Sequence, residues 1–220
     1  MSYTWSHSLD FGSYNSAFPY ERADSDQDVR NNVAAALSYE LPNSRGSSRL
    51  QALTSSWGID GRFTARTGFP VTLDGNEDTD PNTGQFYFGG LNLVSGVPLY
   101  LYGPGSIYPG GRAINPNAFA LPTGTEPGNA PRNFVRGFGA VQTDVAMRRT
   151  FPIFERLQAQ FRVEAFNILN HPNFGLIDPN YGDPQFGEAT ATLSQSLGTL
   201  SPLYQMGGPR SLQLTLKLSF

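Results

Sequence analysis

A short acidic stretch offers the side chains best suited to hold a metal ion. Asp74, Asn76 and Asp78 alternate along it, and carboxylate and amide oxygens are ligands that calcium prefers. An EF-hand loop needs glycine at its sixth position and glutamate at its twelfth, whereas this stretch has Thr79 and Gln85 there. We therefore predict a solvated turn, with a weak calcium site as the alternative.

The remaining chemistry-bearing residues do not form a catalytic pattern. His7 and His171 are the two histidines, and neither has a metal-binding spacing. His171 precedes a proline at the end of a predicted strand, where a structural or exposed position is expected. The sequence has no G-x-S-x-G elbow, no P-loop and no cysteine. We expect no enzymatic activity and no cofactor.

Aromatic side chains are frequent in the middle of the chain and could bind a ligand. Such rings stack on sugars or peptides. A loop of this size also needs apolar residues to pack against itself, so both interpretations stay open. The residues concerned are Phe86, Tyr87, Phe88, Tyr100, Tyr102 and Tyr108.

The composition favours β-structure and argues against nucleic acid as a partner. The 220 residues include 24 glycines and 17 prolines, which is typical of turns and long loops. The net charge is -3, and no basic run could follow a phosphate backbone. No apolar run reaches the roughly 18 residues of a membrane-spanning helix. The first residues do not have the charged and apolar regions of a signal peptide.

Within residues 210–220, polar and apolar side chains alternate strictly from Ser211 to Phe220. A period of two predicts a β-strand with one apolar face. The segment also has the roughly 9–11 residues that a tilted strand needs to cross a bilayer. Lipid on one side and a polar lumen on the other would produce this pattern, but so would a half-buried soluble strand. The apolar row consists of Leu212, Leu214, Leu216, Leu218 and Phe220.

Earlier segments alternate in the same way, with apolar side chains at odd-numbered positions. They are residues 3–11, 29–41, 57–73, 141–151 and 157–165. We predict that the odd positions of the last four segments and the even positions of 210–220 face lipid. Charged side chains at even positions are expected to face the lumen, and these are Asp60, Arg62, Arg66, Asp144, Arg148, Arg162 and Glu164.

The connections between these segments alternate between long and short. The order is long (11–27), short (42–49), long (74–139), short (151–156) and long (170–209). Outer-membrane barrels alternate long extracellular loops with short periplasmic turns. We therefore predict an all-β fold, an antiparallel meander of about six long strands that forms part of an outer-membrane β-barrel with long extracellular loops.

The charges predict how the two strands between residues 141 and 165 pair. The short turn allows a register with Asp144 opposite Glu164 or one with Asp144 opposite Arg162. Opposite charges in facing positions stabilise a sheet by about 0.2–1 kcal/mol per pair. We predict the second register, which also places Val145 opposite Phe161.

Several motifs spread over nearly the whole chain, in the same order, resemble the C-terminal barrel of Oar-like TonB-dependent transporters. They occupy residues 26–32, 66–72, 114–119, 132–137 and 166–175, together with the terminal Leu-x-Leu-x-Leu-x-Phe pattern. The resemblance implies the outer membrane of a Gram-negative bacterium and energised uptake of an unidentified nutrient. It also implies contact with TonB through a plug domain, which we expect residues 1–220 to lack, as they lack a signal peptide.

Two further expectations concern partners. The apolar rows should contact outer-membrane lipid, and the terminal strand should contact the outer-membrane assembly machinery. The alternative function, of a different class, is a soluble extracellular β-sandwich that binds glycans or peptides. Six strands are fewer than the eight of the smallest outer-membrane barrels, so we expect an open sheet with the first and last strands at its edges.

Overall fold

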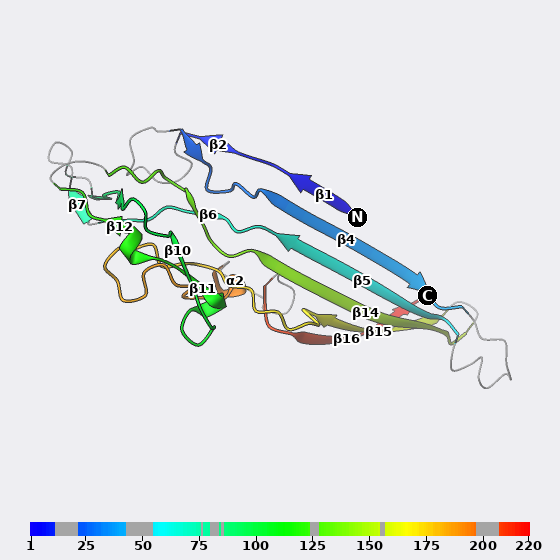
Figure 1. Cartoon of the computed structure of the whole chain (residues 1–220). Coiled ribbons are helices and arrows are strands. Elements are labelled where there is room, and N and C mark those ends of the chain that lie inside the picture. The colour runs from blue at the N-terminus through cyan, green and yellow to red at the C-terminus, as the bar shows by residue number, and fades with distance from the viewer. Residues whose placement is uncertain are drawn as a thin grey trace.

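The computed structural model describes residues 1–11, 22–42, 55–75, 77–79, 84, 86–123, 128–154, 157–196 and 207–220. Its main element is a six-stranded sheet in which every neighbouring pair is antiparallel (Figure 1). The predicted all-β meander of six strands is confirmed. In sheet order, the strands are β1 (Ser2–Trp5), β4 (Asn31–Glu40), β5 (Trp57–Arg66), β14 (Ala140–Pro152), β15 (Gln158–Phe166) and β16 (Ser211–Ser219).

The strand registers align the alternating side chains, so that one face of the sheet is apolar and the other is polar. Tyr39 lies opposite Ile59, which lies opposite Met147 on its other side. Met147 in turn lies opposite Val163, and Val163 lies opposite Leu214. One apolar row therefore crosses five strands.

Much of this apolar face is uncovered. Leu37 is 70% exposed, Leu214 is 69% exposed and Phe63 is 37% exposed. Within the described ranges the other sheets each have two strands, so no second large sheet is present to form a sandwich. Soluble monomers rarely expose an apolar surface of this extent. The exposed apolar face is therefore suited to an apolar environment.

The first strand is shorter than predicted. The alternating residues 3–11 are divided into β1 and β2 (Leu9–Asp10), and β2 pairs with β3 (Ala23–Asp24). Between them, the amide of Ser6 donates to the carbonyl of Arg30 at 3.1 Å. The amide of Ser8 donates to the carboxylate of Asp28 at 2.6 Å. A side chain thus replaces a backbone acceptor, which interrupts the ladder.

The predicted register of the β14–β15 hairpin is wrong. Val145 pairs with Ala165 instead of Phe161, and Arg162 lies opposite Arg148 instead of Asp144. The turn lies further along the chain than the sequence suggested, because β14 continues to Pro152. The amide of Ile153 then donates to the carbonyl of Leu157 at 2.8 Å and closes the turn.

A third strand explains why two arginines can face each other in this hairpin. Asp60 of β5 has its Oδ2 3.2 Å from Arg148 Nε and 2.8 Å from Arg162 Nη1. Its negative charge lies beside both guanidinium groups and offsets their repulsion. The sequence argument compared pairs within the hairpin alone and therefore missed this compensation.

The connections that were predicted to be long loops gather at one end of the sheet (Figure 1). The described parts of these connections contain short paired strands, two 3-10 turns and one helical turn. These elements are β6 (Pro70–Val71) with β13 (Val135–Arg136), β7 (Glu77–Thr79) with β8 (Phe86–Phe88), β9 (Asn92–Leu93) with β12 (Phe119–Ala120), β10 (Tyr100–Tyr102) with β11 (Arg112–Ile114), η1 (Pro109–Gly111), η2 (Pro116–Ala118) and α2 (Leu193–Ser196).

These connections pack against each other and share a hydrophobic core. Ile114 and Val135 are fully buried, and residues from both predicted loops 74–139 and 170–209 contribute. Phe119 and Phe186 meet edge to face, with ring centroids 6.1 Å apart. The core has no regular period because turns rather than long strands supply its residues. Among the described residues, no helix is long and apolar enough to cross a membrane.

Candidate binding site at the loop end of the sheet

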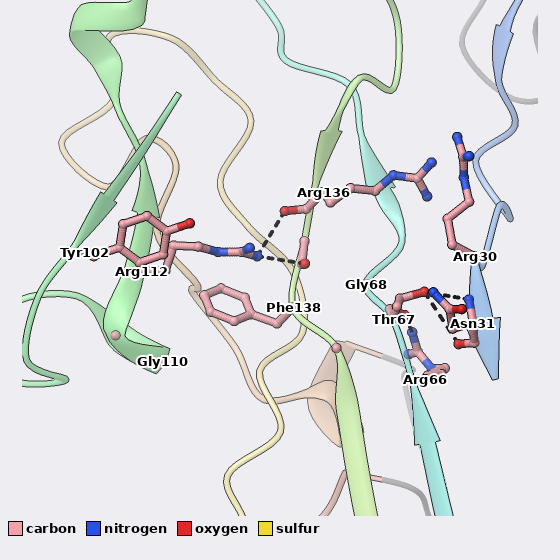
Figure 2. A pocket seen from close by; sticks show the side chains of 13 residues that line it. Arg30, Asn31, Arg66, Thr67, Gly68, Tyr102, Gly110, Arg112, Arg136 and Phe138 are labelled. Carbon is pink, nitrogen blue, oxygen red and sulfur yellow. Dashed lines mark hydrogen bonds between the residues drawn. The ribbon is translucent and has the colours of Figure 1, made fainter. Parts of the chain in front are cut away.

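A cavity of about 720 Å³ lies where the sheet meets the folded loops, and we call it the loop-end cavity. Figure 2 shows that its walls come from three parts of the chain. The ends of β4 and β5 form one wall, β11 and the segment before it form another, and the chain between β13 and β14 forms the third. Its lining residues are Arg30, Asn31, Arg66, Thr67, Gly68, Tyr102, Gly110, Gly111, Arg112, Arg136, Gly137, Phe138 and Gly139.

Glycine at position 68 lets two of these walls approach closely. A Cβ atom there would lie 2.0 Å from the carbonyl oxygen of Gly137, which no backbone could accommodate without moving. The amide of Gly137 also donates to the carbonyl of Phe69 at 2.8 Å. The chain after β5 is therefore fastened directly to the chain after β13.

Arg112 is held rigidly in the cavity wall. Its Nη2 donates to the carbonyls of Arg136 and Gly137, at 3.0 and 2.8 Å, as drawn in Figure 2. The guanidinium carbon lies 4.7 Å from the ring centroid of Tyr100 and 4.9 Å from that of Phe138. Stacking against aromatic rings suits arginine because its planar cation is weakly hydrated.

Arg66, at the end of β5, contributes a second cation to the same cavity. Its Nη1 donates to the carbonyl of Thr67 at 3.2 Å, and its guanidinium carbon lies 4.2 Å from the ring centroid of Phe69. Arg66 has no carboxylate partner among the described residues. It was predicted to face the lumen, and the structure places it at the loop end of the polar face.

The other two arginines of the cavity are neutralised by aspartates. Arg30 lies 2.6 Å from Asp28 and 3.0 Å from Asp24. Arg136 contacts both aspartates and also donates to the carbonyl of Asp28 at 2.7 Å. Burial disfavours the ionised form of Asp28, but the amide of Ser8 and the two guanidinium groups lower its pKa to about 2. This cluster fastens residues 24–30 to β13.

The same cluster contains a histidine, which raises the question of a metal site. His7 Nε2 lies 2.9 Å from Asp24 Oδ1, and ligand atoms of His7, Asp24 and Asp28 lie within 4.8 Å of one another. Both carboxylates are already bound by Arg30 and Arg136. Two guanidinium charges beside the ligands would repel a cation, so the cluster is an ion-pair network rather than a metal centre.

A second ion-pair network lies further down the polar face of the sheet, and we call it the cross-strand network. Besides the two contacts of Asp60 described above, Arg148 contacts Glu40, and Arg162 lies 2.9 Å from Glu164. Four of the predicted lumen residues thus meet in one network that spans β4, β5, β14 and β15. Glu40 was missed, because the sequence does not show which strands are neighbours.

Besides Arg66, two predicted lumen residues lie outside this network. Asp144 Oδ1 accepts from the amide of Asn167 at 2.9 Å and from Gln142 Nε2 at 2.8 Å, so it fixes the turn after β15. Arg62 is exposed on the polar side of β5. The five apolar side chains of the terminal segment are all exposed, as a lipid-facing row requires.

A cavity of about 880 Å³ lies next to the candidate calcium residues. Asp74 lines it, and the Oδ1 atom of Asp74 is buried with no hydrogen-bond partner within the described chain. Burial raises the pKa of Asp74 to about 6. Asn76 and the side chain of Asp78 lie outside the described residues, so the calcium interpretation stays a prediction. The side chains of Phe86, Tyr87 and Phe88 also lie outside them.

Sequence reasoning missed most of the loop-end cavity. Arg30, Arg66 and Arg136 come from three separate motifs that carried the family resemblance, at 26–32, 66–72 and 132–137. Their co-occurrence in those motifs was the available signal. Arg112 lies in a segment with no period and no motif, so no signal pointed to it.

A single-layered sheet with one exposed apolar face, one charged face and folded loops at one end defines an outer-membrane β-barrel protein. The chain matches the family described as Outer membrane beta barrel domain over residues 1–213, and it belongs to that family. Its location is the outer membrane, which overturns the alternative of a soluble β-sandwich. No curated protein and no solved structure matches it.

Proposed function

We propose that this chain is the C-terminal barrel segment of an Oar-like TonB-dependent receptor and takes part in energised uptake of a nutrient. The observation that carries the proposal is the loop-end cavity. Its volume of about 720 Å³ falls within the range of about 300–1,000 Å³ that small-ligand sites occupy. It opens at the end of the sheet with the long loops, which outer-membrane barrels direct to the outside.

The motifs that resemble the Oar-like family support this assignment by their positions. Three of them, at residues 26–32, 66–72 and 132–137, contribute to the cavity wall. Far apart in the sequence, they meet where a receptor would first contact its ligand. The role is transport rather than catalysis in this proposal.

The proposal also names the partners of each surface. The apolar row of β16 contacts lipid, and the same strand is the element that the outer-membrane assembly machinery would bind. The polar face borders the lumen, where a plug domain would connect the ligand site with TonB. Asp60, Arg62, Arg66, Asp144, Arg148, Arg162 and Glu164 are the side chains that we assign to that face.

An uptake experiment in the native bacterium tests the proposal. Strains that lack this gene, TonB or both are compared on a panel of labelled nutrients. We expect one nutrient whose uptake is lost equally in all three strains and is abolished by a protonophore in the parent strain. Uptake that persists without TonB but requires this gene would show a passive channel, and the receptor assignment would be wrong.

A further inference from the structure

We propose that the loop-end cavity binds an anionic group, a carboxylate or a phosphate, between Arg66 and Arg112. The inference rests on the proposed receptor function for its biological meaning, because it gives the substrate class of that receptor. The binding itself depends only on the described side chains. It can therefore be tested without transport.

The first argument is the balance of charges around the cavity. Among the described residues, four arginines line it and no aspartate or glutamate does. Asp24 and Asp28 are not among the lining residues. They form ion pairs with two of the arginines, Arg30 and Arg136. Arg66 and Arg112 have no carboxylate partner among the described residues. The cavity therefore carries two positive charges that the described chain does not neutralise.

The second argument is the number of unused hydrogen-bond donors. A guanidinium group has five N–H bonds. Arg112 uses Nη2 for two backbone carbonyls, and Arg66 uses Nη1 for one. Both side chains are partly buried, and a partly desolvated cation is stabilised by an anionic partner. The remaining donors can supply the paired contacts that carboxylates and phosphates accept.

The third argument is that the two cations are already in place. Arg112 is stacked between two rings and hydrogen-bonded to two carbonyls, and Arg66 lies over Phe69. Figure 2 shows Arg112 entering from the β11 side and Arg66 lying on the β5 side. Fixed donors reduce the ordering cost of binding. The charged side chains among the described lining residues are all arginines, so binding of a cationic ligand is disfavoured.

Binding is measured by calorimetry on the full-length protein, purified from outer membranes in a zwitterionic detergent. The probes are phenyl phosphate, benzoate and the neutral benzamide. We expect both anions to bind and benzamide not to bind. Arg66→Gln should weaken the binding of the anions at least about tenfold, which corresponds to one charge-assisted hydrogen bond, and Arg66→Lys should weaken it less.

The matched control is Arg62→Gln, which removes an arginine from the same face of β5 about 13 Å further along the strand. It should bind like the wild-type protein. Arg112→Gln should also lose affinity, and if it fails to assemble, the Arg66 pair decides alone. Equal binding of benzamide and benzoate, no binding of either anion to wild-type protein, or equal affinities for Arg66→Gln and Arg62→Gln would each overturn the proposal.

A lipid headgroup could supply the same phosphate chemistry as a soluble solute. Repeating the titration in nanodiscs of phosphatidylcholine and of phosphatidylglycerol separates these sources. Competition by phosphatidylglycerol identifies a lipid phosphate, and equal binding in both identifies a soluble anion; either result supports an anion site. If the uptake experiment fails but calorimetry shows anion binding, the receptor function is rejected and the anion site is still supported.

Discussion

At the scale of single residues, the polar face depends on carboxylates that each serve two arginines. Asp60 contacts both Arg148 and Arg162 on the sheet, and Asp28 contacts both Arg30 and Arg136 at the loop end. Such arrangements balance charges from strands or loops that are distant in the sequence. Removal of the shared carboxylate leaves two cations close together, so its loss should cost more than the loss of one ordinary surface pair.

We predict that Asp60→Asn lowers the free energy of unfolding of the full-length protein by about 1–3 kcal/mol. The reason is the direct pairing of Arg148 with Arg162, which would then lack the carboxylate between them. Urea unfolding in detergent measures the effect. Adding Arg162→Gln to Asp60→Asn should recover part of the loss, and a purely additive double variant would contradict the shared-carboxylate interpretation.

A second residue-scale prediction concerns acid. The pKa of Asp28 is lowered from its ordinary value of 3.8 to about 2. A lowered carboxyl pKa stabilises the folded state above the unfolded pKa, and this contribution is lost as the pH falls through the folded value. The advantage of wild-type protein over Asp28→Asn should therefore shrink by about 2 kcal/mol between pH 4 and pH 2. A constant difference in unfolding free energy over this range would contradict the assignment.

Asp74 should behave in the opposite way, because burial raises its pKa to about 6. Its ionised form is penalised in the folded state, so wild-type stability should fall, relative to Asp74→Asn, as the pH rises through 6. The variant should be more stable at pH 8 and equal to wild type at pH 4. Unfolding with and without calcium also decides the alternative of a calcium site, since calcium should then stabilise wild-type protein alone.

At the scale of elements, the alternation of side chains predicted the strands and their apolar rows. It did not predict the strand register, which depends on side chains of neighbouring strands. The period of two located the sheet strands and their apolar rows, because each residue's face is set within its own strand. The β14–β15 register was wrong because Asp60 belongs to a third strand. The loop-end core was not predicted, because residues such as Ile114 and Phe186 lie in turns without a period.

The facing of β16 gives an element-scale prediction. Leu214 lies on the apolar face, whereas its neighbour Gln213 pairs with Glu164 on the polar face. Leu214→Arg should destabilise the inserted protein by about 2–4 kcal/mol, as a cation near the bilayer midplane does. Gln213→Arg should be tolerated, since it faces a carboxylate. Heat-modifiable mobility after outer-membrane extraction measures both, and equal sensitivity of the two positions would contradict the lipid-facing assignment.

At the scale of the whole molecule, the described chain has two faces of different character and one end that carries the loop-end cavity. The apolar face suits lipid, the charged face suits a lumen, and the folded loops place the cavity at one end of the sheet. The sheet itself is open, with β1 and β16 at its edges. A sheet in lipid must close, because each unpaired backbone group there costs several kcal/mol.

We therefore predict that residues 1–220 alone do not form a pore. Six strands are fewer than the eight of the smallest outer-membrane barrels, and exposed edges of this kind promote aggregation. The chain is refolded into liposomes loaded with a small fluorescent dye and is compared with the longer receptor of which we propose it to be a segment. We expect no dye release from the short chain and a protease-sensitive species without heat-modifiable mobility. Dye release together with a protease-resistant, heat-modifiable species would show that copies of the chain close the barrel by joining β1 of one to β16 of another.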